Sequence, residues 1–147
     1  MRHLNGVFHG TNCVFHEFEY PAYFSESYDT ASFFAKRIVG PSYIMKCNLS
    51  FENPFEVSIS GQSWGGFVLP DDKMQRECID YCAGDDEEEL QYLQEEGITV
   101  NALAEYLGTL GYDGIVIHDC YEEDNSVGTQ YVALKSGSAV IESVVQI

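Results

Sequence analysis

The strongest structural signal in the sequence is an amphipathic segment followed directly by an apolar one, over residues 99–119. In "TVNALAEYLGTLGYDG" one helical face carries five apolar side chains: Val100, Leu103, Ala104, Leu107 and Leu110. Gly111 is a typical helix stop. "GIVIHD" at 114–119 is then typical of a largely buried strand. The chain must therefore pack at least one helix against a sheet.

Shorter strand patterns lie on both sides of the helical part. They are residues 5–11, 22–25, 42–50, 53–58, 129–134 and 139–147. Further helical patterns cover residues 27–38, with Ser27 or Asp29 as N-cap, and the chain from Pro70 onward. There Asp72 with Gln75, and Asp85 with Glu88, have capping-box spacing. We expect an α+β fold with mainly antiparallel pairing.

Nothing in the sequence divides the chain, so we expect residues 1–147 to form one domain. No apolar run is long enough for a membrane helix, and no apolar signal region follows the first residues. A protein that does not bind a membrane and lies in the cytoplasm is the expectation. The five cysteines, Cys13, Cys47, Cys78, Cys82 and Cys120, favour reduced thiols, and their spacing does not favour a metal site.

The charge balance restricts the possible partners. Seven basic residues stand against 24 acidic ones, which gives a net charge of −17. Direct nucleic-acid binding is disfavoured, because it needs the opposite sign. Such a surface keeps a protein in solution and steers it toward basic partners, of which a nucleic-acid-binding protein is a natural example.

Several polar side chains lie at the ends of predicted strands: His9, Tyr23, Ser25, Asp119 and Gln130. Each has an ordinary structural interpretation, such as a satisfied core histidine, a core aromatic or an outward-facing glutamine. Their order along the chain is more informative than any one of them. "HGT" at 9–11, "YFSESYDTASFFA" at 23–35, "GYDGIVI" at 111–117 and "TQYVAL" at 129–134 form an ordered set.

This ordered set resembles the ADP-ribosyltransferase superfamily over nearly the whole chain. The likeness is closest to the histidine–tyrosine–glutamate branch, which includes poly(ADP-ribose) polymerases and diphtheria-type toxins. It implies a split antiparallel β-sheet, with helices between and around the halves and NAD held between them. Small phage-encoded transferases that block CRISPR defence resemble the pattern most in size and in their C-terminal strands.

The resemblance also implies roles for the first motif. His9 would hydrogen-bond a hydroxyl of the ribose next to nicotinamide. The backbone of Gly10 would pair with the nicotinamide amide, and Thr11 would support the same region. A ring nitrogen suits a hydroxyl, and glycine permits close approach of the backbone.

The second motif would supply the walls of the nicotinamide pocket. Tyr23 and Phe24 match the family's "YF" strand, and Phe34 falls where a second aromatic often stacks on nicotinamide. Ala31 stands where a polymerase has the serine that binds the amide. Ser25 or Ser32 is the candidate replacement.

The last motif departs from the family at its catalytic position. The usual glutamate–tyrosine pair is Gln130–Tyr131 here, and glutamine carries no charge to stabilise an oxocarbenium-like transition state. Asp119, at the end of the preceding strand, is our candidate for the catalytic carboxylate, with Gln130 as a positioning group. Backup carboxylates in the following loop are Glu122, Glu123 and Asp124.

The implied function is NAD-dependent mono-ADP-ribosylation of a protein, with NAD as substrate and no metal. The target would be a basic nucleic-acid-binding protein such as a CRISPR-Cas subunit, and the role phage counter-defence. Two alternatives stay open. Gln130 favours an inactive transferase fold that blocks a basic partner as an acidic binding module, and water in place of the acceptor would give an NAD glycohydrolase.

Overall fold

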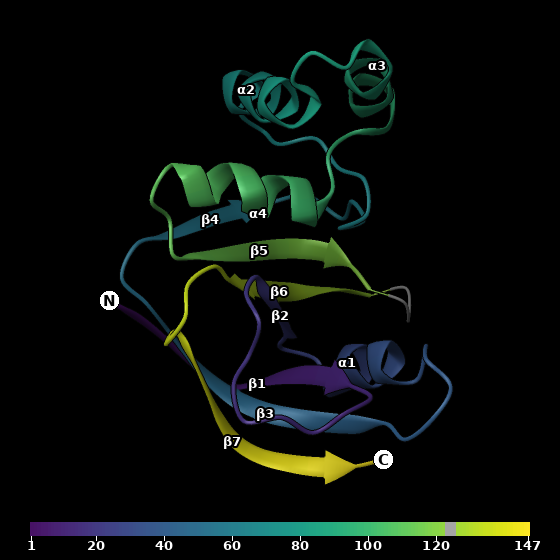
Figure 1. The fold of residues 1–147 in the computed structure, drawn as a ribbon, viewed down its shortest axis with the longest axis vertical. Helices are drawn as coiled ribbons and strands as arrows, with labels where there is room; N and C mark the ends of the chain where they lie inside the picture. The colour runs from purple at the N-terminus through teal and green to yellow at the C-terminus, as the bar shows by residue number, and fades with distance from the viewer. Residues whose placement is uncertain (123–125) are drawn as a thin grey trace.

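The computed structural model describes residues 1–122 and 126–147, which form a mixed α+β fold with one seven-stranded sheet (Figure 1). The elements in chain order are β1 (Arg2–Thr11), β2 (Ala22–Ser25), α1 (Tyr28–Ala35), β3 (Tyr43–Phe51), β4 (Pro54–Ser58), α2 (Asp72–Ala83), α3 (Glu87–Glu96), α4 (Val100–Thr109), β5 (Gly114–Tyr121), β6 (Val127–Ala133) and β7 (Ala139–Gln146). The α+β class expected from the sequence is confirmed.

The strands follow the order β4-β5-β6-β2-β1-β3-β7. All neighbouring strands are antiparallel except β4 and β5, which run parallel because the chain crosses over through α2, α3 and α4 between them. The expected mainly antiparallel pairing is therefore correct for every pair but this one.

The sheet is weakly joined in its middle. Between β1 and β2 only one pair of residues is in register, Phe8 with Ser25. In contrast β2 pairs with β6 over its whole length, and β1 pairs with β3 from Arg2 to Thr11. The sheet thus consists of two parts, a β5 half (β4, β5, β6, β2) and a β3 half (β1, β3, β7).

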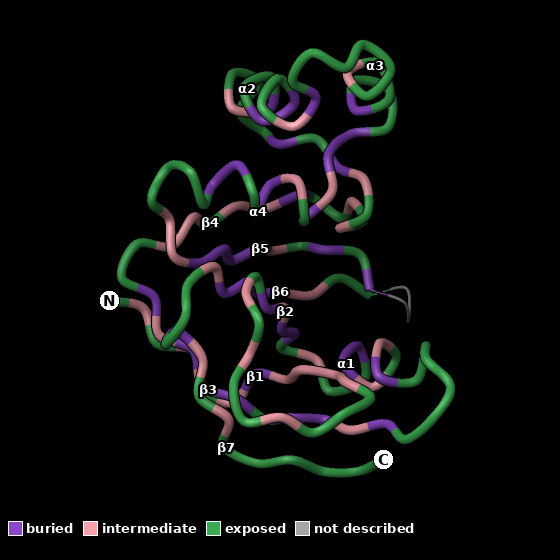
Figure 2. Tube along the Cα trace, viewed as in Figure 1, coloured by how far each residue is buried: buried purple, intermediate pink, exposed green. Residues whose placement is uncertain are grey.

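Consecutive residues of β5, from Gly114 to Ile117, are buried (Figure 2). Because side chains alternate along a strand, both faces of the sheet are covered here. Ile115 and Ile117 face α4 and pack with Leu103 and Leu107, all with no exposed surface. Val116 faces the other way, into a second core built largely on β3: Met45, Cys47, Leu49 and Phe51. The β5 half is held by helices on one face and by the β3 half on the other.

The helix caps differ from two of the expected positions. Ser27 caps α1, as one of the two alternatives had it. The caps of α2 and α3 are Asp71 and Asp86 rather than Asp72 and Asp85. In each pair the capping carboxylate accepts two amides of the first turn, so the neighbouring aspartate is displaced from the capping position.

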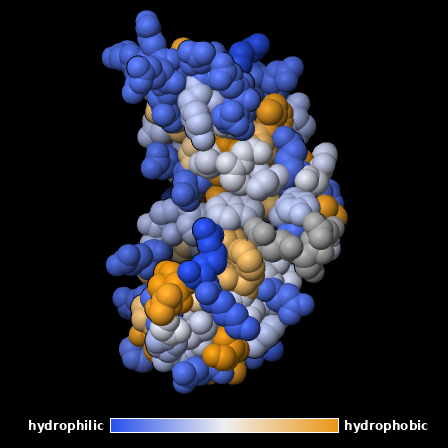
Figure 3. Space-filling view, turned by 90° about the vertical axis from the view of Figure 1, so that its right-hand side faces the viewer, coloured by the Kyte–Doolittle hydropathy of each residue, from blue (hydrophilic) through white to orange (hydrophobic). Residues whose placement is uncertain are grey.

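Helices α2 and α3 stand beyond α4, away from the sheet, and carry a strongly acidic surface. Eleven of the 24 acidic residues lie between Asp71 and Glu96, against two basic ones. Figure 3 shows hydrophilic side chains over this end of the molecule. All five cysteines are free, and burial raises the pKa of Cys47, Cys78 and Cys120 to about 12. In the described part of the chain, every helix falls short of the length and apolarity that crossing a bilayer requires.

Candidate functional site

A pocket of about 320 Å³ lies where the two halves of the sheet meet. Residues from β1, β2, α1 and the turn after it, β6, the start of α4 and the loop before α2 line it: Phe8, His9, Gly10, Tyr23, Phe24, Ser25, Ala31, Phe34, Arg37, Trp64, Val100, Asn101 and Gln130. The lining is mostly aromatic and apolar with a few polar groups, which is the usual character of a small-molecule site.

Seven of the nine candidate site residues line this one pocket. They are His9, Gly10, Tyr23, Phe24, Ser25, Phe34 and Gln130. Two do not line it: Thr11 and Asp119. The pocket joins segments that are more than 120 positions apart in the sequence, because β2 lies between β1 and β6.

His9 has a defined proton arrangement. Its Nδ1 lies 2.7 Å from the backbone carbonyl oxygen of Tyr23, which can only accept, so Nδ1 carries the hydrogen and donates it. Burial lowers the pKa of His9 below 6.5, although the bond to the Tyr23 carbonyl partly opposes this effect. The ring is therefore neutral near pH 7, with Nε2 as an acceptor.

The ring of His9 is held among aromatic side chains. Centroids of Phe18, Phe24 and Phe15 lie 5.0, 5.6 and 5.9 Å from it. On the Phe15 and Phe18 side is a second hollow of about 460 Å³, and His9 and Tyr23 line both spaces. The imidazole thus stands at the division between two neighbouring hollows with its orientation fixed by packing and by the Tyr23 carbonyl.

Gly10 has a structural reason to be glycine. A Cβ at this position would lie 2.0 Å from the carbonyl oxygen of Ala31, so α1 packs directly on the backbone of β1 here. Thr11 turns away from the pocket lining: its hydroxyl donates to the carbonyl of Cys13 at 3.2 Å and accepts from the Cys13 amide.

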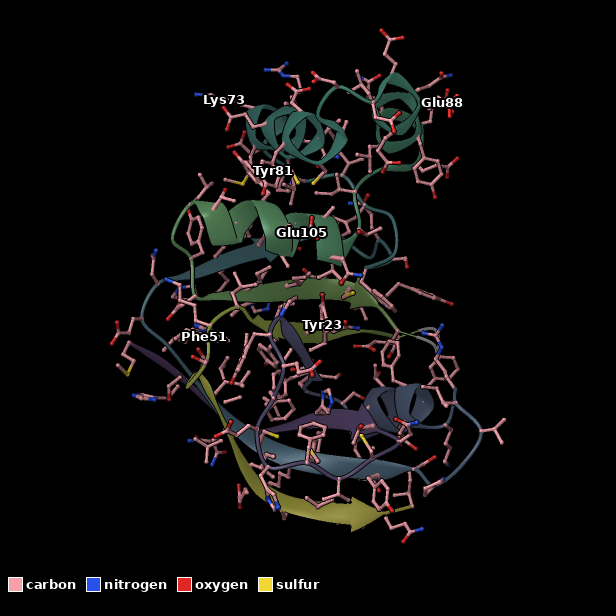
Figure 4. All side chains as sticks on the ribbon, viewed as in Figure 1. Tyr23, Phe51, Lys73, Tyr81, Glu88 and Glu105 are labelled. Atoms are coloured by element: carbon pink, nitrogen blue, oxygen red, sulfur yellow. The ribbon has the colours of Figure 1, made fainter. Side chains whose placement is uncertain are left out.

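Tyr23 connects β2 to α4. Its hydroxyl donates to the side-chain oxygen of Asn101, and burial together with the nearby carboxylate of Glu105 raises its pKa. Figure 4 shows Tyr23 beneath α4, the helix that carries Glu105. Tyr23 is thereby fixed as part of the pocket wall.

Gln130 lies directly opposite Ser25 in the β2–β6 register, so both side chains are on one face of the sheet. Its Nε2 is buried and has no hydrogen-bond partner. Ser25 is 4% exposed, and its hydroxyl oxygen accepts from the amide of Ser27 at 3.0 Å. A buried amide donor without a partner is costly, and in a pocket wall it marks where a ligand acceptor fits.

Six lining residues were not among the sequence-based candidates. Phe8 and Ala31 lie next to or within the matched motifs, and the other four are Arg37, Trp64, Val100 and Asn101. Trp64 packs edge-on against Phe34 at 5.3 Å, and its carbonyl accepts the amide of Val100 at 3.0 Å. The one tryptophan in a glycine-rich loop was a visible signal for Trp64. Nothing local in the sequence pointed to the other three, which reach the pocket only through tertiary packing.

Asp119 lies at an irregularity of β5. The register between β5 and β6 shifts between Ile117 and Cys120, and Asp119 adopts a positive φ of 56°. Its exposed carboxylate accepts from the hydroxyl of Ser58, and its carbonyl accepts the amide of Gly61 at 2.6 Å. The residue anchors the beginning of the loop that carries Trp64.

Glu122 is the buried carboxylate nearest in sequence to this bulge, with 3% of its surface exposed. The hydroxyl of Thr30, next to the pocket residue Ala31, donates to it. Gly128 makes room for it, because a Cβ there would lie 2.5 Å from the Glu122 carboxylate. The other two backup candidates, Glu123 and Asp124, lie outside the described residues.

No aspartate or glutamate among the described residues lines the pocket, and no cluster of metal-ligating side chains occurs in residues 1–122 and 126–147. The site offers one ring acceptor, amide and hydroxyl groups, aromatic walls and one guanidinium. Such a set suits a flat ring joined to a polar, anionic body. The chain matches no protein-family model, no curated protein and no solved structure.

Proposed function

We propose that this protein is an NAD-dependent mono-ADP-ribosyltransferase that modifies a protein target. The observation that carries the proposal is the meeting of His9, Tyr23 and Gln130 in one pocket, from three segments whose order resembles that superfamily. Composition and periodicity do not require these residues to meet.

The sheet supports the same proposal. The resemblance implies two half-sheets with NAD between them, and here β1 and β2 are in register at a single pair, with the pocket beside this junction. We propose that the fold is an ADP-ribosyltransferase-like split sheet.

The pocket's chemistry fits the nicotinamide end of NAD. Phe34 and Trp64 provide flat apolar surface for the ring, while the unpartnered Nε2 of Gln130 provides a donor. The neutral ring of His9 offers Nε2 to a ribose hydroxyl, because Nδ1 is committed to the Tyr23 carbonyl.

When bound, NAD would supply the C–N bond between ribose and nicotinamide: nicotinamide would leave with the bonding electron pair, and a target side chain would bond to the ribose carbon and release its proton to solvent. His9, with its orientation fixed, holds the ribose, and the aromatic walls exclude water from the ring. Gln130 orients the ligand but carries no charge that could stabilise positive character at the ribose.

Since no described lining residue is a carboxylate, the catalytic carboxylate has to come from outside that lining. Asp119 remains the first candidate, and Glu122 is the second, since it is buried and bonded to Thr30, the residue before Ala31. Paired variants distinguish them. If Asp119 is catalytic, Asp119→Ala abolishes modification and Glu122→Gln, which can still accept from Thr30, retains it; the opposite pattern assigns Glu122.

The second candidate function is an inactive transferase fold that acts as an acidic binding module. The absence of any carboxylate from the described pocket lining favours it. Its partner would be a basic nucleic-acid-binding protein, such as a CRISPR-Cas subunit, that docks on the acidic α2–α3 surface. The same target class serves the transferase proposal, with phage counter-defence as the role.

The decisive experiment incubates the protein with labelled NAD and a host lysate. One labelled protein band, lost in Asp119→Ala or Glu122→Gln and weakened in His9→Ala, supports transfer. Nicotinamide release without any acceptor protein indicates a glycohydrolase. Stoichiometric inhibition of a basic partner without NAD indicates the binding module, and contradicts the transferase.

A further inference from the structure

The pocket has a charge pattern opposite to that of the whole chain. The sequence has seven basic and 24 acidic residues, yet the described lining contains one arginine and no carboxylate. The second hollow, in contrast, has Glu17 and Glu19 in its wall and no basic residue. Arg37 is thus the one cation that either hollow offers within the described residues.

Arg37 is positioned by the end of α1. The helix ends at Ala35, and the amide of Arg37 donates to the carbonyl of Phe34 at 3.3 Å. Its guanidinium lies over the Phe34 ring, 5.7 Å from the centroid. The same ring packs against Trp64 at 5.3 Å, so the cation continues an aromatic wall of the pocket.

The guanidinium belongs to an exposed residue, and no described residue forms an ion pair with it. The ion pairs of the described residues involve Arg2, Lys46, Lys73 and His118, and none reaches Arg37. Its N–H donors therefore remain available at the rim of the pocket, while one face of the group rests on an aromatic ring. A planar fork of donors held in this way matches the geometry of phosphate oxygens.

The electrostatic surroundings make this arrangement selective. A chain of charge −17 repels anions over most of its surface, so an anionic ligand gains little from non-specific attraction. Among the described residues, the pocket lining itself contains no carboxylate and one cation. Any anionic group bound there depends on Arg37 to an unusual degree.

We propose that Arg37 forms an anion subsite at the rim of the pocket, which binds a phosphate group of the ligand. Its identification with the pyrophosphate of NAD rests on the proposed function; the anion subsite itself rests only on the charge pattern and the placement of Arg37. The site then divides into an aromatic inner part around Phe34 and Trp64 and a phosphate-binding rim.

Isothermal titration with two ligands tests the subsite. NAD carries the pyrophosphate, whereas nicotinamide riboside has the same inner part and no phosphate. Arg37→Gln should weaken NAD binding roughly ten- to hundredfold, the usual range for a charged hydrogen bond, and change nicotinamide riboside binding less than about twofold. Arg37→Lys should be intermediate, because lysine keeps the charge but loses the fork and the stacking on Phe34.

Lys36→Gln is the matched control, since Lys36 is the neighbouring exposed cation and does not line the pocket. It should leave both affinities unchanged. ADP as a third probe separates the two proposals. Binding of ADP that depends on Arg37, without NAD binding, supports the anion subsite and contradicts the proposed function.

NAD binding that is equal in wild type and Arg37→Gln contradicts the subsite and leaves the proposed function intact. Equal losses in Arg37→Gln and Lys36→Gln also contradict it, because they would reflect net charge alone. A wild-type protein that binds none of the phosphate-bearing probes overturns both proposals.

Discussion

The pocket and the α2–α3 end of the molecule differ in how charge is distributed. Residues 71–96 carry eleven acidic side chains, most of them solvent-exposed, whereas no described pocket residue is acidic and Arg37 lies at the rim. The acidic residues behind the net charge of −17 therefore lie at the helical end and elsewhere on the chain, and none of the described ones lines the pocket. In our proposals partner attraction and ligand binding belong to different parts of one small chain, so they should respond to different substitutions.

The largest effect should come from filling the contact between α1 and β1. Gly10→Val places a side chain where a Cβ already lies 2.0 Å from the Ala31 carbonyl, so the helix or the strand must move. We expect a loss of about 2–3 kcal/mol in unfolding free energy, with loss of pocket binding. Denaturant unfolding followed by circular dichroism measures it.

Gly108→Ala is the opposite case and serves as the control. This exposed glycine lies within α4, and a methyl group added to it would meet no atom of a neighbouring element within 4 Å. Removing its backbone freedom should stabilise the protein by about 0.5–1 kcal/mol without affecting the pocket. Equal destabilisation by both substitutions would contradict the special role of the Gly10 contact.

A carboxylate placed in the pocket would remove the difference in acidic charge between the pocket and the α2–α3 end. Gln130→Glu restores the family's glutamate at a position of nearly the same shape. If NAD binds as proposed, nicotinamide release should rise about tenfold or more, because the carboxylate stabilises positive character at the ribose. Chromatography of released nicotinamide measures it, with Gln130→Ala as the control that removes both amide and charge.

If Gln130→Glu leaves the rate of nicotinamide release unchanged, Gln130 does not lie close to the bond that reacts. Activity that appears only in this variant, with an inactive wild type, would instead favour the binding module.

The pH response of ligand binding should follow His9. Its pKa is lowered from 6.5 chiefly by burial, so the ring stays neutral above pH 6.5 and Nε2 can accept. NAD affinity should be constant from pH 8 to 6.5 and fall once the pH passes below the folded pKa, by at most about tenfold per pH unit. Titration calorimetry between pH 5.5 and 8 measures this profile.

His9 should make folding stability depend on pH in the same direction as NAD affinity, with both rising as the pH rises. Between the lowered folded pKa and 6.5 the unfolded chain binds more protons, so stability rises with pH across that window. His9→Gln keeps an acceptor and cannot titrate, so a pH profile unchanged by this substitution would assign the response to another group.

The smallest effect should come from the acidic end. Neutralising Glu87, Glu88 and Glu89 to glutamine removes exposed charge from the first turn of α3. The association rate with polylysine should fall several-fold at low salt, with the difference shrinking as salt rises. NAD affinity should stay within about twofold of wild type, and a larger change would show that the two regions are not independent.

Local patterns were sufficient for most elements and insufficient for the site. The apolar pattern of α4 predicts a helix well because one of its faces is buried. The apolar run of β5 predicts a strand well because both of its faces are buried. The caps at Asp71 and Asp86 were each placed one residue away, since adjacent aspartates have the same local signal. The strand-end position of Asp119 does not reveal the bulge that turns its backbone to positive φ, and its catalytic role stays a prediction.

Residues that reach the pocket by tertiary packing had no such signal. Arg37 follows a helix end, and Asn101 begins a helix far along the chain. Only the ordered resemblance predicts that His9, Tyr23 and Gln130 share one site, and all three line the pocket.

The single Phe8–Ser25 pair has a mechanical consequence. With one ladder pair between the two halves of the sheet, backbone pairing joins them less than it joins the strands within either half, and the buried side chains of the second core supply the rest of the junction. A ligand that contacts His9 of β1 and Gln130 of β6 acts as a second crosslink between them. Its binding should therefore slow hydrogen exchange in β1 and β2 together, so that the molecule stiffens as a whole when its pocket is filled.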